Sequence, residues 1–334
     1  MDCIVVQVYP DGLCPPIAQL MLSTLEILLP VFALIFAGFA CRRRNLLGPT
    51  AASELNRFVV WLALPALLFD TMAHSTWRQL DQPGFVMTFS VACAAVFLGV
   101  VVVRLVQGRH LADASVDAIA ASYPNTGYIG FPLGMIVFGN ASLTPTTIAT
   151  IIVACVLFAF AIVLIEVGLQ AERAPHKLGL KVLRSLAKNP LIVSPIAGAL
   201  VASAHWTLPH SAETFLKLLS GAASPCALVS LGLFLAEKRP AGNGRRTSLV
   251  FTAIKLVAQP AFTWWMAARV FALPADAVDM AVLLAALPTG TGPYMLAEFY
   301  RREAHVTSQT ILYSTLASLV TLSLLLVVMQ RHGI

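Results

Sequence analysis

The chain has 334 residues, of which 58% are hydrophobic and only 11% charged, and its mean hydropathy is +0.81. Because an ordinary soluble domain carries about 25% charged residues, this composition excludes a water-soluble single fold. The 22 Lys and Arg outweigh the 16 Asp and Glu and give a net charge of +6. That charge lies between long apolar stretches, so the expected partner is the lipid bilayer, and no nucleic acid is expected.

Long apolar runs, interrupted by charged residues, Pro and Gly, predict an all-α polytopic membrane protein with ten transmembrane helices. In chain order these helices cover residues 23–41, 53–72, 84–106, 114–138, 146–169, 187–204, 214–235, 247–271, 275–298 and 306–329. Residues 1–22 form an N-terminal extension without the basic start and clean apolar run of a signal peptide. The apolar pattern begins directly after Met21, which is therefore a candidate for the true start.

Basic residues mark every second connection between the predicted helices. They gather at residues 42–44, 104–109, 173–188, 238–246 and 301–302, in the first, third, fifth, seventh and ninth loops. Loops rich in Lys and Arg remain in the cytoplasm, so both termini are expected outside. The predicted location is a bacterial inner membrane that the chain crosses many times.

Prolines recur at a nearly constant spacing in the two halves of the chain. The pairs are Pro30 and Pro195, Pro65 and Pro225, and Pro124 and Pro288, which lie 165, 160 and 164 residues apart. This spacing predicts two five-helix repeats, at residues 23–170 and 187–330, joined by a cytoplasmic linker at 171–186. Because five spans is an odd number, the second repeat is inverted relative to the first, which is a geometry suited to alternating access.

The fourth and ninth predicted helices each contain a sequence that no regular helix accommodates. Residues 123–132 read YPNTGYIGFP and residues 287–294 read LPTGTGPY, so that prolines and glycines interrupt both helices. Unwound backbone at membrane depth survives only where it is buried in protein or lines a cavity. If the two breaks cross, half-helix N-termini would offer free amides and positive dipole ends to an anion. The alternative is that both are kinked helices packed through small residues.

The predicted substrate site therefore lies at the two breaks. The candidate substrate-binding residues are Asn125, Thr126, Gly127, Tyr128, Thr289, Gly290, Thr291 and Tyr294, and the candidate crossover residues are Pro124, Pro132, Pro288 and Pro293.

Charged side chains are absent from the broken segments themselves. Glu166, Asp70 and Lys255 lie in apolar surroundings near predicted helix ends, where extension to the membrane interface is expected. The histidines show no metal-ligand spacing, and no nucleotide-binding or hydrolase motif occurs. The sequence therefore predicts no metal site, no cofactor and no enzyme, and leaves coupling to H⁺ or Na⁺ open.

These motifs, in this order, resemble the auxin efflux carrier family of permeases, whose bacterial members include carriers of malonate and related carboxylates. The resemblance runs from residue 22 to residue 329 and rests on residues 29–32, 42–44, 63–69, 124–127, 130–132, 189–190, 287–291 and 296–300. It implies two inverted five-helix repeats, akin to those of sodium-bile acid symporters and sodium-proton antiporters. It also implies that helices four and nine cross at breaks formed by Pro124 and Pro288. It further implies that Asn125 contacts a substrate carboxylate, that helices one, two, six and seven form a scaffold, and that the carrier is a homodimer. The long loop of plant auxin carriers is absent between helices five and six, so auxin is not inferred as the substrate.

The predicted function is secondary active or facilitative transport of a small organic anion, malonate or a related carboxylate, by alternating access. Two alternatives remain at this point, a sodium-coupled symporter of organic anions and a membrane sensor that does not transport.

Overall fold

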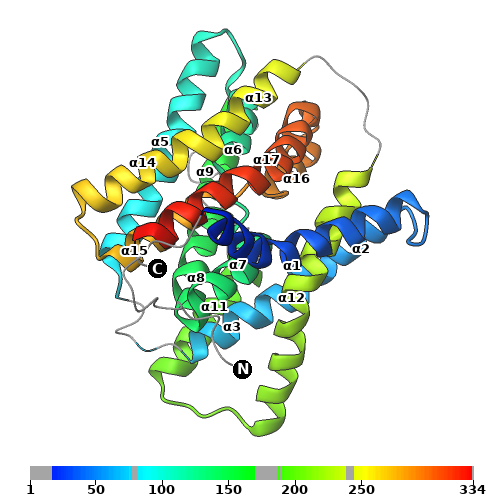
Figure 1. Cartoon of the computed structure of the whole chain (residues 1–334). Coiled ribbons are helices and arrows are strands. Elements are labelled where there is room, and N and C mark those ends of the chain that lie inside the picture. Colours follow the sequence, from blue (N-terminus) through cyan, green and yellow to red (C-terminus); the bar gives the residue numbers. More distant parts are fainter. Residues whose placement is uncertain are drawn as a thin grey trace.

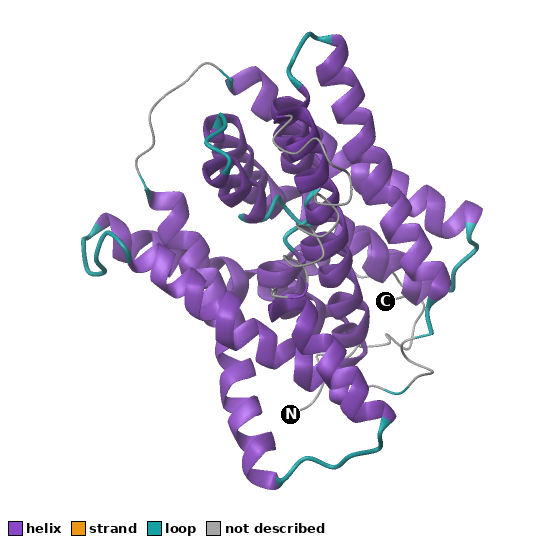
Figure 2. Cartoon of the chain, turned by 180° about the vertical axis from the view of Figure 1, so that it is seen from behind, coloured by secondary structure: helices purple, strands orange, loops and turns teal. Residues whose placement is uncertain are grey.

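The computed structural model describes residues 17–74, 76, 81–169, 187, 190–237 and 244–332, and one isolated bridge is the sole non-helical pairing within these ranges. Figure 2 shows the helices from behind, with short loops between them. Five helical stretches in this part of the chain are long and apolar enough to cross a membrane, namely Ala51–Ala73, Pro83–Val106, Thr126–Leu169, His210–Ala236 and Ala304–Gln330. The protein is therefore a multi-pass membrane protein.

The helices of the first half begin with α1 (Ile17–Arg43), a continuous run of α2 (Ala51–Phe58), η1 (Val59–Ala63) and α3 (Leu64–Ala73), and then α5 (Pro83–Val106). They continue with α6 (Leu111–Ser122), η2 (Thr126–Gly130), α7 (Phe131–Phe138), η3 (Gly139–Ser142), α8 (Leu143–Ile151), η4 (Ile152–Leu157) and α9 (Phe158–Leu169). The second half contains α11 (Pro190–Ser203), α12 (His210–Ala236), α13 (Arg245–Ala253), η5 (Ile254–Ala258), α14 (Gln259–Trp265), η6 (Met266–Val270), α15 (Ala275–Ala286), α16 (Gly292–Phe299) and α17 (Ala304–His332).

Helix occurs within each of the ten predicted ranges, and α1 starts at Ile17, before the predicted residue 23. Most of the expected N-terminal extension and the expected linker at residues 171–186 lie outside the described residues.

Prolines account for three widened turns inside these helices. Pro65, Pro132 and Pro260 each lie two residues after a π-helical segment, which is η1, η2 and η5 respectively. Proline has no N–H and its ring clashes with the carbonyl group four residues earlier, so the turn before it opens. Helical structure therefore continues through these prolines at the cost of a local irregularity.

The helices form two groups, which Figure 1 shows side by side. In the scaffold group, α1 packs against α12, and α3 packs against α11 and α12. In the crossing group, α5 packs against α6, α6 against α9 and α16, α13 and α16 against α17, and α14 against α15. In Figure 1, α2 and α12 lie on the right, and α5, α14 and α15 lie on the left.

Glycine permits the close helix contacts of the scaffold group. A Cβ atom added at Gly38 of α1 would lie 2.1 Å from the Val229 carbonyl oxygen of α12. A Cβ atom added at Gly198 of α11 would lie 2.4 Å from the Phe69 carbonyl oxygen of α3. Both distances are far below van der Waals contact, so only glycine fits between these backbones, as at other close contacts of membrane helices.

Polar contacts tie the end of α16 to the rest of the crossing group. The Tyr300 hydroxyl donates to Glu166 of α9 over 2.8 Å, and Glu166 is only 3% exposed. The prediction that Glu166 extends to the membrane interface is therefore wrong, because Tyr300 provides a buried partner. The Arg302 Nε donates to Asp113 at the start of α6 over 2.7 Å, and this hydrogen bond raises the pKa of Arg302.

Candidate functional site

The two broken helices cross at an antiparallel bridge between Pro124 and Thr289. The Asn125 N–H donates to the Pro288 carbonyl oxygen over 2.8 Å, and the Gly290 N–H donates to the Tyr123 carbonyl oxygen over 3.1 Å. These bonds pair backbone groups that the breaks at residues 123–125 and 287–291 remove from the helices. Unpaired backbone groups are costly inside a membrane protein, so each break provides hydrogen-bond partners for the backbone of the other.

Four half-helix ends meet around this bridge. The helices α6 and α15 end at Ser122 and Ala286, and η2 and α16 begin at Thr126 and Gly292. The C-terminal ends carry partial negative charge and unpaired carbonyl groups, and the N-terminal ends carry partial positive charge and unpaired N–H groups. The crossing can therefore attract a cation on one side and an anion on the other.

Asn125 lies at the N-terminus of η2 and is only 4% exposed. Its Oδ1 accepts a hydrogen bond from the Tyr128 N–H over 3.3 Å, so it caps the half-helix. Its Nδ2 is buried and has no hydrogen-bond partner among the described residues. A buried amide donor without an acceptor is unusual in proteins, and it provides a group that a bound anion would satisfy.

A polar cluster connects the crossing to α2, which continues through η1 into α3 of the scaffold group. The Tyr128 hydroxyl donates to the Asn56 Oδ1, and Tyr128 also forms a side-chain hydrogen bond with Thr291. On the neighbouring face, the Tyr294 ring packs edge-on against Phe234 of α12, with ring centroids 5.0 Å apart. Both crossing helices therefore contact the scaffold group through a tyrosine.

The Tyr123 ring covers the second break. A Cβ atom added at Gly290 would lie 3.0 Å from the Tyr123 Cε1, and one added at Gly292 would lie 2.9 Å from the Tyr123 Cζ. The glycines therefore make room for the ring. Tyr123 and Gly292 are half-buried, as are Gly127 and Thr291, so this side of the crossing is partly accessible.

Two other predicted site residues, Thr289 and Thr126, are buried and form hydrogen bonds within the protein. Thr289 is fully buried, its Oγ1 donates to the Ala120 carbonyl oxygen over 2.9 Å, and its N–H donates to the Ser314 Oγ over 3.0 Å. Thr126 is 2% exposed, and its N–H donates to the Pro124 carbonyl oxygen over 2.8 Å.

Pro124 and Pro288 lie in the breaks, but Pro132 and Pro293 are the second residues of α7 and α16. The first turn of a helix tolerates proline, so these two prolines begin helices beside the crossing and do not themselves interrupt them.

On the other side of the crossing, Lys255 and Gln259 contact the C-terminal ends of the half-helices. The Lys255 Nζ donates to the Ala285 carbonyl oxygen of α15 over 2.6 Å, and Lys255 is completely buried. The Gln259 Nε2 donates to the Ser122 carbonyl oxygen of α6 over 3.2 Å. The prediction that Lys255 extends to the membrane interface is therefore wrong, because the half-helix carbonyl group holds it in the interior.

Asn56 and Gln259 are missed from the sequence because they belong to no motif. Tyr123 begins the motif at residues 123–132 but is not among the predicted binding residues, because its role depends on contacts with the distant Gly290 and Gly292. Lys255 carries a signal that the sequence does offer. It lies ten residues after Arg245, where α13 begins, and at about 1.5 Å per residue this places it near the middle of a hydrocarbon core about 30 Å thick.

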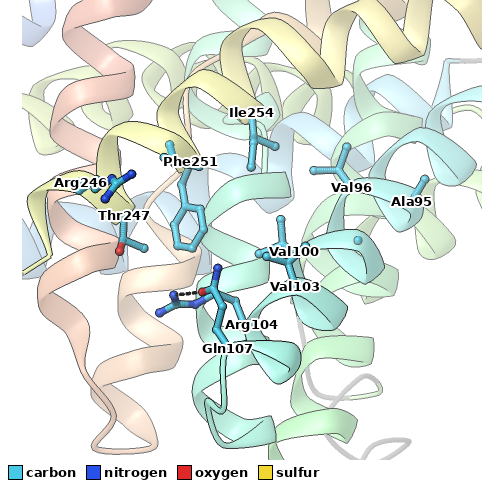
Figure 3. A pocket seen from close by; sticks show the side chains of 12 residues that line it. Ala95, Val96, Val100, Val103, Arg104, Gln107, Arg246, Thr247, Phe251 and Ile254 are labelled. Carbon is cyan, nitrogen blue, oxygen red and sulfur yellow. Dashed lines mark hydrogen bonds between the residues drawn. The ribbon is translucent and has the colours of Figure 1, made fainter.

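A groove of about 670 Å³ lies away from the crossing, between α5 and α13. Figure 3 shows its lining, with Val100, Arg104 and Gln107 on one side and Arg246 and Phe251 on the other. The substrate residues predicted at the crossing do not line this groove.

Interrupted helices that cross inside a multi-pass helical fold are typical of membrane transporters. The chain belongs to the membrane transport protein family, which matches residues 23–326. It is 29% identical over 313 residues to a Rhizobium meliloti protein named "Putative malonate transporter", covering 92% of this chain and 96% of the relative.

Two other relatives cover similar lengths. Auxin efflux carrier component 8 of Arabidopsis thaliana is 23% identical over 349 residues, covering 87% of this chain and 93% of the relative. An uncharacterized transporter of Methanothermobacter thermautotrophicus is 25% identical over 323 residues, covering 93% of this chain and all of the relative. The family and these relatives are transporters, not enzymes, and the auxin efflux carrier resemblance is confirmed.

Proposed function

We propose that the protein is a secondary carrier that binds a small organic anion at the crossing and moves it across the membrane by alternating access. The observation that carries this proposal is the Asn125 Nδ2, a buried donor without a partner at a half-helix N-terminus. A carboxylate there would accept this N–H and interact with the positive ends of η2 and α16. The half-buried Thr291 would add a hydroxyl group from the second break.

The proposed movement is that of the crossing group against the scaffold group. Two inverted repeats would exchange α1 with α11 and α3 with α12, so the contact between α1 and α12 would correspond to that between α11 and α3. Both contacts are among the tightest of the fold, and Gly38 and Gly198 occupy corresponding positions in them. The proposed topology has ten spans in a bacterial inner membrane, with both termini outside. The basic residues in the odd-numbered loops support this orientation.

The proposed substrate class is a short dicarboxylate such as malonate. A relative with this name covers nearly all of the chain. Donors from two half-helices at one crossing also suit a molecule with two carboxylates close together. Neutral donors favour an anion over a cation, because no Asp or Glu lies in residues 123–132 or 287–294.

Uptake by purified protein in proteoliposomes tests this proposal. The panel contains radiolabelled malonate, malate, succinate and an indole acid, each with and without sodium and pH gradients. Saturable uptake of malonate or another short dicarboxylate is expected. Binding without uptake would instead indicate the sensor, and no binding of any acid by folded protein would contradict the proposal.

A further inference from the structure

Lys255 is completely buried, and no ion pair within the described residues involves it. Its neighbours come from three helices. Ala285 of α15 accepts its hydrogen bond, Cys93 of α5 lies nearby, and Gln259 lies one turn further along its own helix. Burying an ammonium group without a carboxylate is very unfavourable, so a lysine at this place keeps its proton only where other groups carry partial negative charge.

The half-helix C-termini provide that charge. The Ala285 carbonyl belongs to the last turn of α15, and the Ser122 carbonyl is the last of α6. Lys255 contacts the first, and Gln259 donates to the second. The Gln259 Oε1 remains buried with no hydrogen-bond partner among the described residues. Carbonyl groups at half-helix C-termini bind cations in other transporters, and here one of these carbonyl groups accepts a hydrogen bond from Lys255.

We propose that Lys255 is a built-in cation that occupies the place of a coupling metal ion, so that this carrier operates without sodium. Its ammonium group neutralises the C-terminal ends of the crossing helices and leaves their N-terminal ends to the substrate anion. Lys255 is thus a positioning residue, since it acts on the substrate through the crossing. This inference rests on the proposed function for its transport test and on the structure alone for its stability test.

The stability test needs no substrate. The unfolding temperature of detergent-purified protein is measured in sodium chloride and in choline chloride of equal concentration. The wild type is expected to unfold at the same temperature in both salts. Lys255→Ala removes the built-in cation and is expected to gain stability in sodium chloride alone, because Na⁺ can reach the vacated carbonyl groups. A sodium-dependent rise in the wild type, or none in Lys255→Ala, would overturn the inference.

The transport test uses Lys255→Met and a matched control, Lys217→Met. Lys217 is an exposed residue of α12 whose Nζ lies 3.9 Å from Glu213, so its replacement removes the same charge at the surface. Uptake by Lys255→Met is expected to fall about tenfold or more, since hydrogen bonds to charged groups contribute at least this much. Uptake by the wild type and by Lys217→Met should be equal with and without sodium.

Three transport results would overturn the inference: sodium-dependent wild-type uptake, normal uptake by Lys255→Met, and equal losses in both variants. Propylammonium, which replaces the missing part of the side chain, should restore uptake to Lys255→Ala. Failure of rescue by both propylammonium and Na⁺ would show that the crossing does not need the cation itself. If the wild type transports none of the acids, the proposed function fails, and the stability test alone decides the role of Lys255.

A second inference concerns the groove between α5 and α13, which is independent of the crossing. Its walls are apolar over most of its length, and Arg104, Gln107, Arg246 and Thr247 lie together at one end. The lining of α5 extends from Ala95 to Gln107, about 18 Å at 1.5 Å per residue. This length is close to that of one leaflet of hydrocarbon, about half of 30 Å.

We infer that the groove binds an anionic phospholipid of the cytoplasmic leaflet, with its acyl chains along the apolar wall and its headgroup at the basic end. The charge of Arg104 is already balanced, because its Nε donates to Asp117 over 2.7 Å. Arg246 is exposed and has no ion-pair partner among the described residues, so it provides the free positive charge. An acidic headgroup complements this charge, and a zwitterionic one does not.

Native mass spectrometry and unfolding temperatures, measured with phosphatidylglycerol or phosphatidylcholine, test this site. The wild type should retain phosphatidylglycerol preferentially and be stabilised by it. Arg246→Ala should lose this preference, and Arg245→Ala, which removes the same charge at a residue that does not line the groove, should keep it. Equal retention of both lipids by the wild type, or equal effects of the two variants, would overturn the inference.

Discussion

Replacing Asn125 separates its role as a helix cap from its role as a donor to the anion. Asn125→Ala removes an N-cap, which costs about 1 kcal/mol, but it also removes a buried unpaired donor, whose burial costs about 1–3 kcal/mol. The two effects oppose each other, so the free energy of unfolding should change little. A hydrogen bond to a charged group contributes about 1.5–3 kcal/mol, so the affinity for a carboxylate should fall about 10- to 150-fold.

Asn125→Asp provides the sharper comparison, because Asp retains the capping oxygen and nearly the same shape. It replaces the Nδ2 donor by an acceptor and adds a negative charge where the anion is expected to bind. The assay is the concentration dependence of malonate uptake in proteoliposomes, with unfolding temperatures as the control for folding. We expect uptake by Asn125→Asp to be weaker than by Asn125→Ala. A KM within about twofold of the wild type for Asn125→Asp would refute the placement of the anion at this residue, since a lost charged hydrogen bond gives a larger change.

Two further predictions concern the crossing and the topology. Gly292→Ala places a Cβ atom 2.9 Å from the Tyr123 ring and should slow uptake. The control Gly99→Ala places a Cβ atom with no other atom within 4 Å and should leave the uptake rate unchanged. Equal uptake rates for the two variants would contradict the role of Tyr123. In a background without other cysteines, Leu46→Cys and Trp206→Cys, both exposed in loops, should react with an impermeant maleimide from opposite sides of the membrane, and labelling from the same side would overturn the proposed topology.

The sequence predicts the breaks because proline and glycine act locally. Glycine follows Pro124 and Pro288 within three residues, and each break lies where this combination occurs, whereas α1 continues through Pro30. Pro132 and Pro293 show the limit of this reasoning. A proline can end a helix or lie in the first turn of the next one, depending on the residue at which the helix begins again. The pairing of the two breaks determines that residue.

Contacts between distant segments could not be predicted from one sequence. The hydrogen bond between Tyr128 and Asn56 joins residues 72 positions apart in the sequence, and the one between Gln259 and Ser122 joins residues 137 positions apart. The position of Lys255 ten residues into its helix indicates depth in the membrane, but the carbonyl group that holds it there belongs to Ala285, 30 residues further on. Secondary structure thus follows from local chemistry, whereas the partners of the buried polar groups follow from the packing of the helices.

Determining the structure of the purified carrier with malonate bound, by electron cryomicroscopy in lipid nanodiscs, tests the central claim most directly. The account predicts density for the anion at the crossing, with a carboxylate oxygen within hydrogen-bond distance of the Asn125 Nδ2 and near the start of α16. Density for malonate elsewhere, with the Asn125 amide still unpaired, would contradict the claim that the crossed half-helices bind the substrate.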